Sequence, residues 1–438
     1  MAIIPQRQLF SWKEIENLAD LQRFSLLIKY LPDEELMDKL ESGRSKGRND
    51  YPVRAIWNSI LAGIVYQHPS IESLRRELMR NGQLRQLCGF DLFKGIKVVP
   101  SANAYTNFLK LLVRHSDLID GIFYDLVEKL RDILPGFGNT LAIDSKAIRS
   151  RSRRQSRRKH IDGRGEADAD KGVKTYKGKR KDGSMWESVK SWFGFKLHLI
   201  VDANYELPVD YKVTKASASD IAVGRDMVKD LALNRPEVLE NAEFLLGDKG
   251  YDDTKLITTL WNEHHVKPVI DIRDLWKINR ARLVHGQTNV SHDYKGTVYC
   301  HCPVEWKKRP MAFGGFEEDR NTLKYRCPAR HYGLECKGRD RCWISDNIRI
   351  DIDSNPRIFT PLARSSYKWK TIYNKRSSAE RVNSRLDESF CFEKHFIRGM
   401  KKMEFRCGLA LIVMLGMAYG RVKEKQPDKL RSLVQPAA

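Results

Sequence analysis

The sequence predicts a mixed α/β sheet with helices, preceded by an all-α N-terminal domain and interrupted by a small cysteine-containing insertion. Helical periodicity dominates before residue 135, short alternating strands follow Gly136, and helical periodicity returns after a polar, cysteine-bearing stretch. The expected boundaries are 1–135 for the helical DNA-binding or dimerisation domain, 136–273 with 356–424 for the α/β domain, 274–355 for the insertion subdomain and 425–438 for a C-terminal tail.

The amino-acid composition indicates which kinds of molecule this protein could bind. The chain has 438 residues with 78 Lys and Arg against 56 Asp and Glu, a formal net charge of +22. A hydrophobic content of 41% excludes a wholly disordered chain. A protein this basic most often binds a polyanion, usually nucleic acid and less often an acidic membrane surface. The alternative is a basic soluble enzyme whose charge has no such partner.

Two further features concern location. The first residues, Met1–Asn17, contain no apolar segment typical of a secretory signal, so we expect a cytoplasmic protein with eight reduced cysteines. The longest apolar stretch, Cys407–Gly420, is shorter than the ~20 residues that span a bilayer. We therefore expect a buried core helix there and no membrane partner.

The N-terminal domain is expected to be helical throughout. Apolar residues between Val53 and Ile64 recur at three- and four-residue steps, which predicts an amphipathic helix. Ser70 and Ser101 stand where N-caps of two further helices are expected. Two helices joined by a short proline-containing turn favour either a helix-turn-helix that reads a DNA groove or a packed hairpin used for dimerisation.

The α/β domain is predicted from short segments in the order β-β-β-α-β-α-β. Strands are expected at 140–144, 192–204, 207–214, 242–248 and 266–272, with helices at 221–233 and 253–263. A charged helix at 371–390 and the apolar Cys407–Gly420 helix complete the domain after the insertion. Two of the strands end on a carboxylate, Asp144 and Asp248.

These two aspartates suggest a metal site. Carboxylates on neighbouring strands repel one another unless a cation lies between them, which favours Mg²⁺ or Mn²⁺. Glu380 is the candidate third ligand, and Tyr373, Arg376 and Glu380 follow one another at i, i+3 and i+7 on one expected helical face. The alternative is that both aspartates form ordinary turns and that Arg376 and Glu380 form a surface ion pair.

Three segments carry a family resemblance. LAIDSKAI, LLGDKGYD and YNKRSSAERVNSRLD resemble the catalytic blocks of bacterial insertion-sequence transposases of the DDE type. The resemblance implies a ribonuclease-H-like core in which Asp144, Asp248 and Glu380 bind Mg²⁺ or Mn²⁺ and Tyr373 and Arg376 contact DNA. It further implies cleavage and strand transfer at the terminal inverted repeats of the element, a homodimer assembled on transposon-end and target DNA, and a location at the bacterial nucleoid.

The resemblance has one departure. The family usually has a lysine seven residues after the glutamate, where it meets the transposon end, and this chain has Asp387. Arg385 or Lys394 is expected to make the phosphate contact instead. Two other functions remain open at this point: a non-catalytic DNA-binding protein derived from a transposase, and a metal-dependent DNA nuclease that cuts without joining.

A basic run follows the first aspartate. The segment Ser150–Lys159 has six Lys and Arg among ten residues and no acid. We expect it to hold DNA phosphates beside the active site; the alternative is a solvated loop without a specific role. The DNA-contacting side chains expected here are Arg149, Arg151, Arg153, Arg154, Arg157 and Arg158.

The insertion holds five of the eight cysteines between Cys300 and Cys342. About 80 polar residues with few aliphatic runs are expected to need a metal to order themselves. Four thiolates predict one structural Zn²⁺, with Cys300, His301 and His331 as substitute ligands; the alternative is a set of free reduced cysteines. The predicted zinc ligands are Cys302, Cys327, Cys336 and Cys342.

Overall fold

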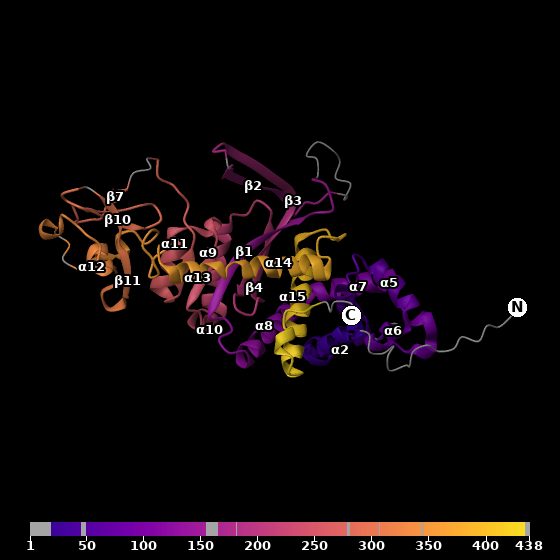
Figure 1. Ribbon diagram of the computed structural model, residues 1–438. Helices are drawn as coiled ribbons and strands as arrows, with labels where there is room; N and C mark the ends of the chain where they lie inside the picture. Colours follow the sequence, from indigo (N-terminus) through magenta and orange to yellow (C-terminus); the bar gives the residue numbers. More distant parts are fainter. Residues whose placement is uncertain are drawn as a thin grey trace, which may run out of the picture.

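The structure, a computed structural model, describes most of the chain. The described residues are 19–44, 50–154, 165–180, 182–277, 281–305, 307–342, 344 and 346–433. The molecule is elongated, with the N-terminal helices at one end, the insertion at the other and the main sheet between them (Figure 1).

The N-terminal region is helical, as the sequence predicts. Ser70 and Ser101 are N-caps: their side chains accept hydrogen bonds from the backbone N–H groups of Ser73 (3.1 Å) and Ala104 (3.2 Å). The helices are α2 (Ala19–Tyr30), α3 (Glu34–Ser42), α4 (Val53–Val65), α5 (Ile71–Arg80), α6 (Gly82–Cys88), η1 (Leu92–Val98), α7 (Ala102–Arg114) and α8 (Ser116–Ile133).

The main sheet mixes antiparallel and parallel strands. β3 pairs antiparallel with β2, β1 and β4, whereas β1, β5 and β6 run parallel to one another. The five expected strands are all present, but β1 extends five residues beyond its expected end, and β2 is an additional strand that the sequence did not predict. The strands are β1 (Thr140–Arg149), β2 (Asp170–Lys179), β3 (Met185–Asp202), β4 (Leu207–Lys215), β5 (Phe244–Gly247) and β6 (Lys267–Ile270).

Helices cover the sheet. The expected 371–390 helix is divided, because Lys375 and Arg376 form a turn between α13 and α14. α14 packs against β1 and β3, and α9 packs against β4. The helices are α9 (Asp220–Asn234), α10 (Pro236–Glu240), η2 (Lys249–Tyr251), α11 (Thr254–Thr258), η3 (Thr259–Glu263), α13 (Tyr367–Asn374), α14 (Ser377–Phe390) and α15 (Met400–Lys423).

The C-terminal helix α15 joins the N-terminal helices to the sheet. It packs against α2, α4 and α8 on one side of the boundary at residue 135 and against β4 on the other. Buried residues from all these elements form one continuous hydrophobic cluster. In the described part of the chain, the N-terminal helices therefore have no separate core, which differs from the independent helical unit expected from the sequence.

α15 is longer than the apolar stretch that predicted it. Among the described residues it is the one helix that is long and apolar enough to cross a membrane, and 78% of its apolar window is buried inside the protein. Its side chains from Cys407 to Ala418 are buried. The helix is thus the core helix that the sequence predicts, with an exposed basic and polar first turn that the apolar run did not include.

The insertion contains two small antiparallel sheets and a core of its own. Its buried cluster includes Val290, Leu323, Tyr325 and Ile350. The sequence analysis did not expect this core, because short alternating strands bury apolar surface without long aliphatic runs. One sheet has β7 (Arg282–Leu283), β8 (Val290–His292), β9 (Val298–His301) and β10 (Lys308–Pro310); the other has β11 (Ala312–Glu317), β12 (Thr322–Arg326) and β13 (Asn347–Asp351).

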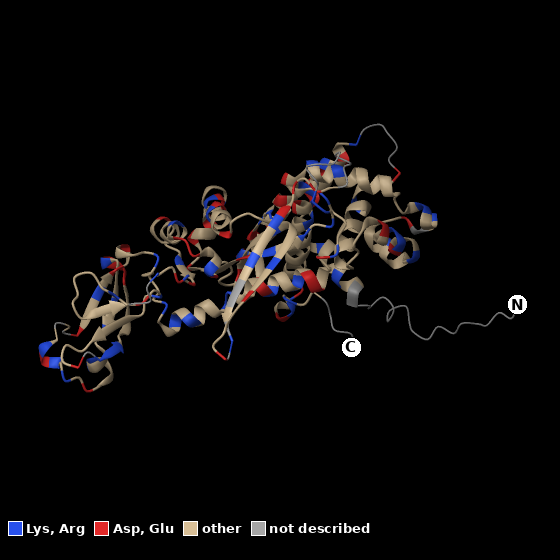
Figure 2. Cartoon of the chain, turned by 90° about the horizontal axis from the view of Figure 1, so that it is seen from above, with Lys and Arg blue, Asp and Glu red and all other residues tan. Residues whose placement is uncertain are grey.

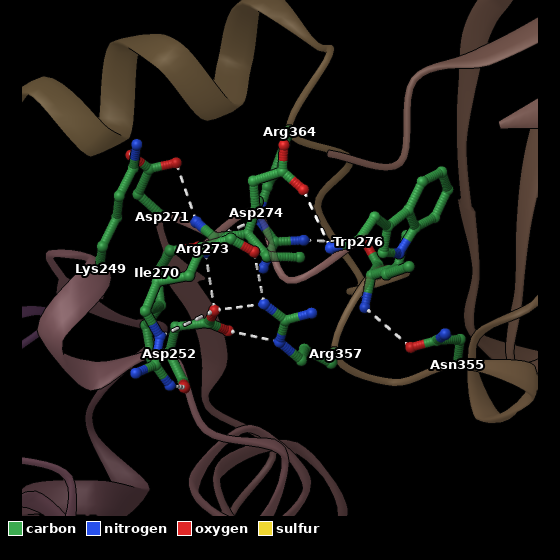
Figure 3. Close-up of polar contacts among 12 residues, drawn as sticks. Lys249, Asp252, Ile270, Asp271, Arg273, Asp274, Trp276, Asn355, Arg357 and Arg364 are labelled. Carbon is green, nitrogen blue, oxygen red and sulfur yellow. Dashed lines mark hydrogen bonds and ion pairs between the residues drawn. The ribbon is translucent and has the colours of Figure 1, made fainter. Parts of the chain in front are cut away.

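A buried carboxylate ties the insertion to the main domain (Figure 3). Asp252 accepts hydrogen bonds from the Arg273 backbone N–H (2.8 Å) and from Nη2 of Arg357 (2.6 Å), and its side chain is fully buried. The same Arg357 nitrogen donates to the Arg273 carbonyl at 2.6 Å. Since Arg273 leads into the insertion and Arg357 leads out of it, both crossings of the chain meet at Asp252.

Candidate active site

The strand register brings Asp144 and Asp248 together. β1 and β5 are parallel neighbours, with Ala142 opposite Leu246. Two residues further along each strand stand Asp144, inside β1, and Asp248, directly after β5. Because neighbouring strands lie about 4.8 Å apart, the two carboxylates occupy adjacent positions at this edge of the sheet. The Asp248 carboxylate accepts a hydrogen bond from the Gly250 N–H at 2.7 Å.

Asp144 shows the electrostatic effect of this arrangement. Burial raises the pKa of its carboxyl to about 6, and the negative charge of Asp248 acts in the same direction. The Ser145 backbone N–H, Lys174 and Arg376 partly offset the rise. A carboxylate that is costly to ionise at neutral pH is expected where a cation is to be bound.

Glu380 and Arg376 lie beside the pair. Nη1 of Arg376 contacts Oε1 of Glu380 at 2.8 Å, and the Glu380 side chain is 56% exposed. The negative charges of Glu380 and Asp248 both raise the pKa of Arg376, while Arg376 lowers that of Asp144. The guanidinium is therefore paired with Glu380 and lies near enough to Asp248 and Asp144 to balance part of their charge.

Tyr373 is the remaining member of this group. Its ring stacks on Trp369 with centroids 4.5 Å apart, and the Arg376 guanidinium lies 5.7 Å from the ring centroid. The division of the expected helix thus leaves Tyr373, Arg376 and Glu380 adjacent. Sequence spacing placed them together correctly, although it expected one continuous helix.

Two polar residues that the sequence analysis missed contact this region. Nδ2 of Asn383 donates to Oδ2 of Asp144 at 3.2 Å, and Nζ of Lys174 lies 3.4 Å from the Ser145 carbonyl oxygen. Asn383 stands three residues after Glu380 on α14, so the helix periodicity offered a signal for it. Lys174 lies on the unpredicted strand β2, and no sequence signal connected it with Asp144.

A third aspartate lies near the same edge. Oδ1 of Asp220 contacts Nζ of Lys196 at 2.9 Å, and the charges of Asp220, Asp144 and Asp248 all add to the effect of burial in raising the pKa of Tyr251. Carboxylates from three separate parts of the chain therefore lie near Tyr251.

Asp387 does not stand in an open DNA-binding position. It forms an ion pair with Lys146, whose side chain is 10% exposed and which stands two residues after Asp144 on β1. Arg385 is not available as the replacement phosphate contact, because it hydrogen-bonds to the Glu206 backbone carbonyl and contacts the Glu206 carboxylate at 3.3 Å. Lys394 is exposed.

The basic segment after β1 is described only as far as Arg154. Arg157 and Arg158 lie outside the described residues. The other four arginines line a hollow of about 350 Å³ together with Trp192 and Phe193. The Arg151 guanidinium also lies 4.1 Å from the centroid of the Phe396 ring. The four are Arg149, Arg151, Arg153 and Arg154.

The sequence predicted a magnesium or manganese site at the aspartates and a zinc site in the insertion. Within the described residues, no group of three or more His, Cys, Asp or Glu side chains is arranged to hold a metal ion. The Asp144 and Asp248 carboxylates still supply the hard oxygen donors that Mg²⁺ prefers, with Glu380 within reach of Arg376. Asp144 and Asp248 thus fit a divalent cation, whereas the expected third ligand, Glu380, is paired with Arg376.

The cysteines of the insertion lie near one another but do not support zinc. Burial raises the pKa of Cys300 to about 11, and the neighbouring Cys327, Cys342 and Cys336 add to the rise. Nδ2 of Asn289 lies 3.4 Å from Sγ of Cys342. No disulfide links any of them, and the described residues hold no group of three or more His, Cys, Asp or Glu arranged for a metal ion, so the zinc expectation finds no support.

Comparison with known proteins assigns the family. A comparison with the curated proteins finds no match. One solved structure, a piggyBac transposase synaptic complex with hairpin DNA, aligns over 97% of this chain and 87% of that chain at 13% identity, with a TM-score of 0.28 that is too low to support an argument. The family model described as a transposase DDE domain matches residues 135–415. This chain therefore belongs to the DDE-domain transposase family.

Proposed function

We propose that this protein is a DNA transposase that binds the terminal inverted repeats of its own insertion sequence and catalyses metal-dependent strand cleavage and strand transfer. The observation that carries the proposal is the parallel register of β1 and β5, which sets Asp144 beside Asp248. Family membership supplies the reaction class. The elevated pKa of Asp144, at about 6, supports a role in binding a cation.

Asp144 and Asp248 would hold the divalent cation, and Glu380 would join them once Arg376 is drawn away. Mg²⁺ or Mn²⁺ supplies the charge that activates the attacking hydroxyl group and stabilises the leaving oxygen. A DNA phosphate is a natural partner for the planar guanidinium of Arg376, since phosphate oxygens accept its paired N–H groups. Arg376 would then hold the phosphate while Asn383 keeps the Asp144 carboxylate oriented.

The positive charge of the chain and the position of its arginines both favour DNA as the partner. The four described arginines at the hollow and the exposed Lys394 would contact phosphates of duplex DNA. We propose that two copies of the chain assemble on a pair of transposon ends, and that the protein works in the cytoplasm of a bacterium, at the nucleoid. Arg385 and Lys394 are the two expected replacements for the missing lysine. Because Arg385 is hydrogen-bonded to Glu206, we propose that Lys394 makes the phosphate contact.

The test is incubation with a DNA fragment that bears the ends of the element, with Mg²⁺ or Mn²⁺. We expect discrete cleavage that frees 3′-hydroxyl ends and then joined products. Cleavage without joining would instead identify a nuclease, and binding without cleavage would identify a non-catalytic DNA-binding protein. Asp144→Asn should abolish cleavage and leave DNA binding nearly unchanged.

A further inference from the structure

The hairpin of β2 and β3 extends well beyond the main sheet. β1 and β4 pair with β3 only from Gly194 and Phe195 onward, whereas its outer part, Met185–Phe193, pairs with β2 among the described residues. At about 3.4 Å per residue, this two-stranded ribbon is roughly 30 Å long. Figures 1 and 2 both show it leaving the body of the molecule.

The ribbon is braced by paired tryptophans and glycines. Gly172 stands opposite Trp192, and Gly178 stands opposite Trp186. A Cβ at Gly172 would lie 2.5 Å from the ring of Trp192, and one at Gly178 would overlap Trp186 in the same way. Each indole thus lies flat over a glycine, which stabilises a ribbon that would otherwise be marginal in water.

The ribbon surface combines positive charge with exposed apolar side chains. Val173, Val189 and Met185 are 54%, 59% and 70% exposed. Figure 2 shows Lys and Arg along the ribbon. Among the described side chains between residues 170 and 190, the bases are Lys171, Lys174, Arg180 and Lys190, and the acids are Asp170, Asp182 and Glu187. Such a surface is suited to a polyanion that also offers apolar contacts.

The base of the ribbon continues into the arginine-lined hollow. Trp192 and Phe193 of β3 form one wall, and the chain that leaves β1 forms the other. Arg149 stands five residues after Asp144 on the same strand, which places the two about 17 Å apart along β1. That distance matches about five nucleotides of a DNA strand at 3.4 Å each.

We propose that the ribbon and the hollow at its base form a DNA-binding arm, with the ribbon in the major groove and the arginines of the hollow on phosphates about five nucleotides from the reacting phosphate. The major groove admits a two-stranded ribbon. Charge decides between duplex DNA and a second copy of this chain, because a copy with a net charge of +22 would be repelled. The proposal rests on the proposed function, since it requires DNA at the carboxylates.

The salt dependence of binding tests the arm. Lys171 and Lys190 are exposed on the ribbon, and Lys229 and Lys255 are exposed on α9 and α11. For a duplex that bears the element ends, Lys171→Ala/Lys190→Ala should lower the slope of log K against log salt by about 1.8, since each lost phosphate contact removes about 0.9. The matched control, Lys229→Ala/Lys255→Ala, removes the same charge and should leave the slope unchanged. Equal slopes for the two variants would overturn the proposal.

A crosslink identifies the occupant of the arm. A photoreactive benzophenone side chain at Val189 should label end-bearing DNA. A crosslink only to a second copy of the chain would assign the ribbon to dimerisation and overturn the proposal. Cleavage of the same fragment by the wild type separates the two hypotheses. If the wild type cuts the fragment and the Lys171/Lys190 variant binds it as the wild type does, only the proposed DNA-binding arm is wrong. If the arm binds DNA that the wild type never cuts, only the proposed transposase function is wrong.

Discussion

At the scale of single residues, the candidate site depends on charges held away from water. Asp144 is in contact with Asn383 and near Asp248, and burial is the main reason why its pKa is raised to about 6. A native pKa above the unfolded value means that the folded state binds more protons between about pH 4 and pH 6. The contribution of Asp144 to stability is therefore present below this window and is lost as the pH rises through it.

This sign gives a prediction for Asp144→Asn in buffer that contains EDTA. Between pH 4 and pH 8, the free energy of unfolding of the wild type should fall relative to that of the variant by roughly 2–3 kcal/mol, since one pKa unit corresponds to about 1.4 kcal/mol. Urea unfolding followed by circular dichroism at each pH measures it. Asp182→Asn, in an exposed turn, is the control and should show no such relative loss. Identical pH profiles for wild type and Asp144→Asn would contradict the burial of this charge.

A second residue-scale prediction concerns Lys146 and Asp387. Burial raises the pKa of Asp387, and hydrogen bonding to Lys146 acts against that rise. Lys146→Met should cost about 2 kcal/mol, because it leaves a half-buried carboxylate without its main partner. Lys146→Met/Asp387→Leu should recover most of the loss, and denaturant unfolding of the four members of this cycle measures the coupling. Strictly additive losses would show that the pair contributes no coupling.

The sequence predicted the acidic residues of the site but not their polar neighbours. Asp144 and Asp248 could be found because each follows an apolar strand, and Glu380 because of its spacing from Arg376. Lys174 could not be found by these means, because its approach to Ser145 depends on strand pairing between segments far apart in the sequence. The failure of Arg385 has the same cause, since its partner Glu206 lies in the turn between β3 and β4.

At the scale of elements, short alternating strands were the hardest to predict. β2 is rich in lysine and glycine, which are poor strand formers, and it is stabilised by Trp192 and Trp186 on its partner. The insertion was interpreted as too polar to fold because its apolar residues are scattered. They are scattered with the two-residue period of half-buried strands, so that Leu323, Tyr325, Ile348 and Ile350 meet on one face of a sheet.

The core of the insertion can be tested with Ile350→Ala. The side chain is 3% exposed, and its truncation should destabilise the insertion by about 2–4 kcal/mol through lost burial and a residual cavity. Hydrogen exchange measured by mass spectrometry should then accelerate in β12 and β13 and remain unchanged in β1. Val304→Ala, at an exposed position of the same subdomain, is the matched control. Unchanged exchange in β12 and β13 would show that this core does not hold the insertion together.

At the scale of the whole molecule, α15 makes the N-terminal helices and the sheet interdependent. A chain truncated to begin at Gly136 should not fold as a soluble unit, because α15 and β4 would expose the apolar faces that α2, α4 and α8 cover. Size-exclusion chromatography and circular dichroism of the truncated chain measure this outcome. Replacement of residues 282–351 by a short linker is the comparison, since it leaves that cluster intact and should preserve its folded signal. A monomeric, cooperatively folded chain from Gly136 would contradict the shared core.

The position of α15 near the end of the chain also determines when folding can finish. During synthesis, α4 and α8 leave the ribosome long before residues 400–423 have been made. Their apolar faces therefore stay uncovered until α15 emerges, close to the end of synthesis. Interrupted synthesis therefore yields products that lack the closing helix and are exposed to proteases and chaperones.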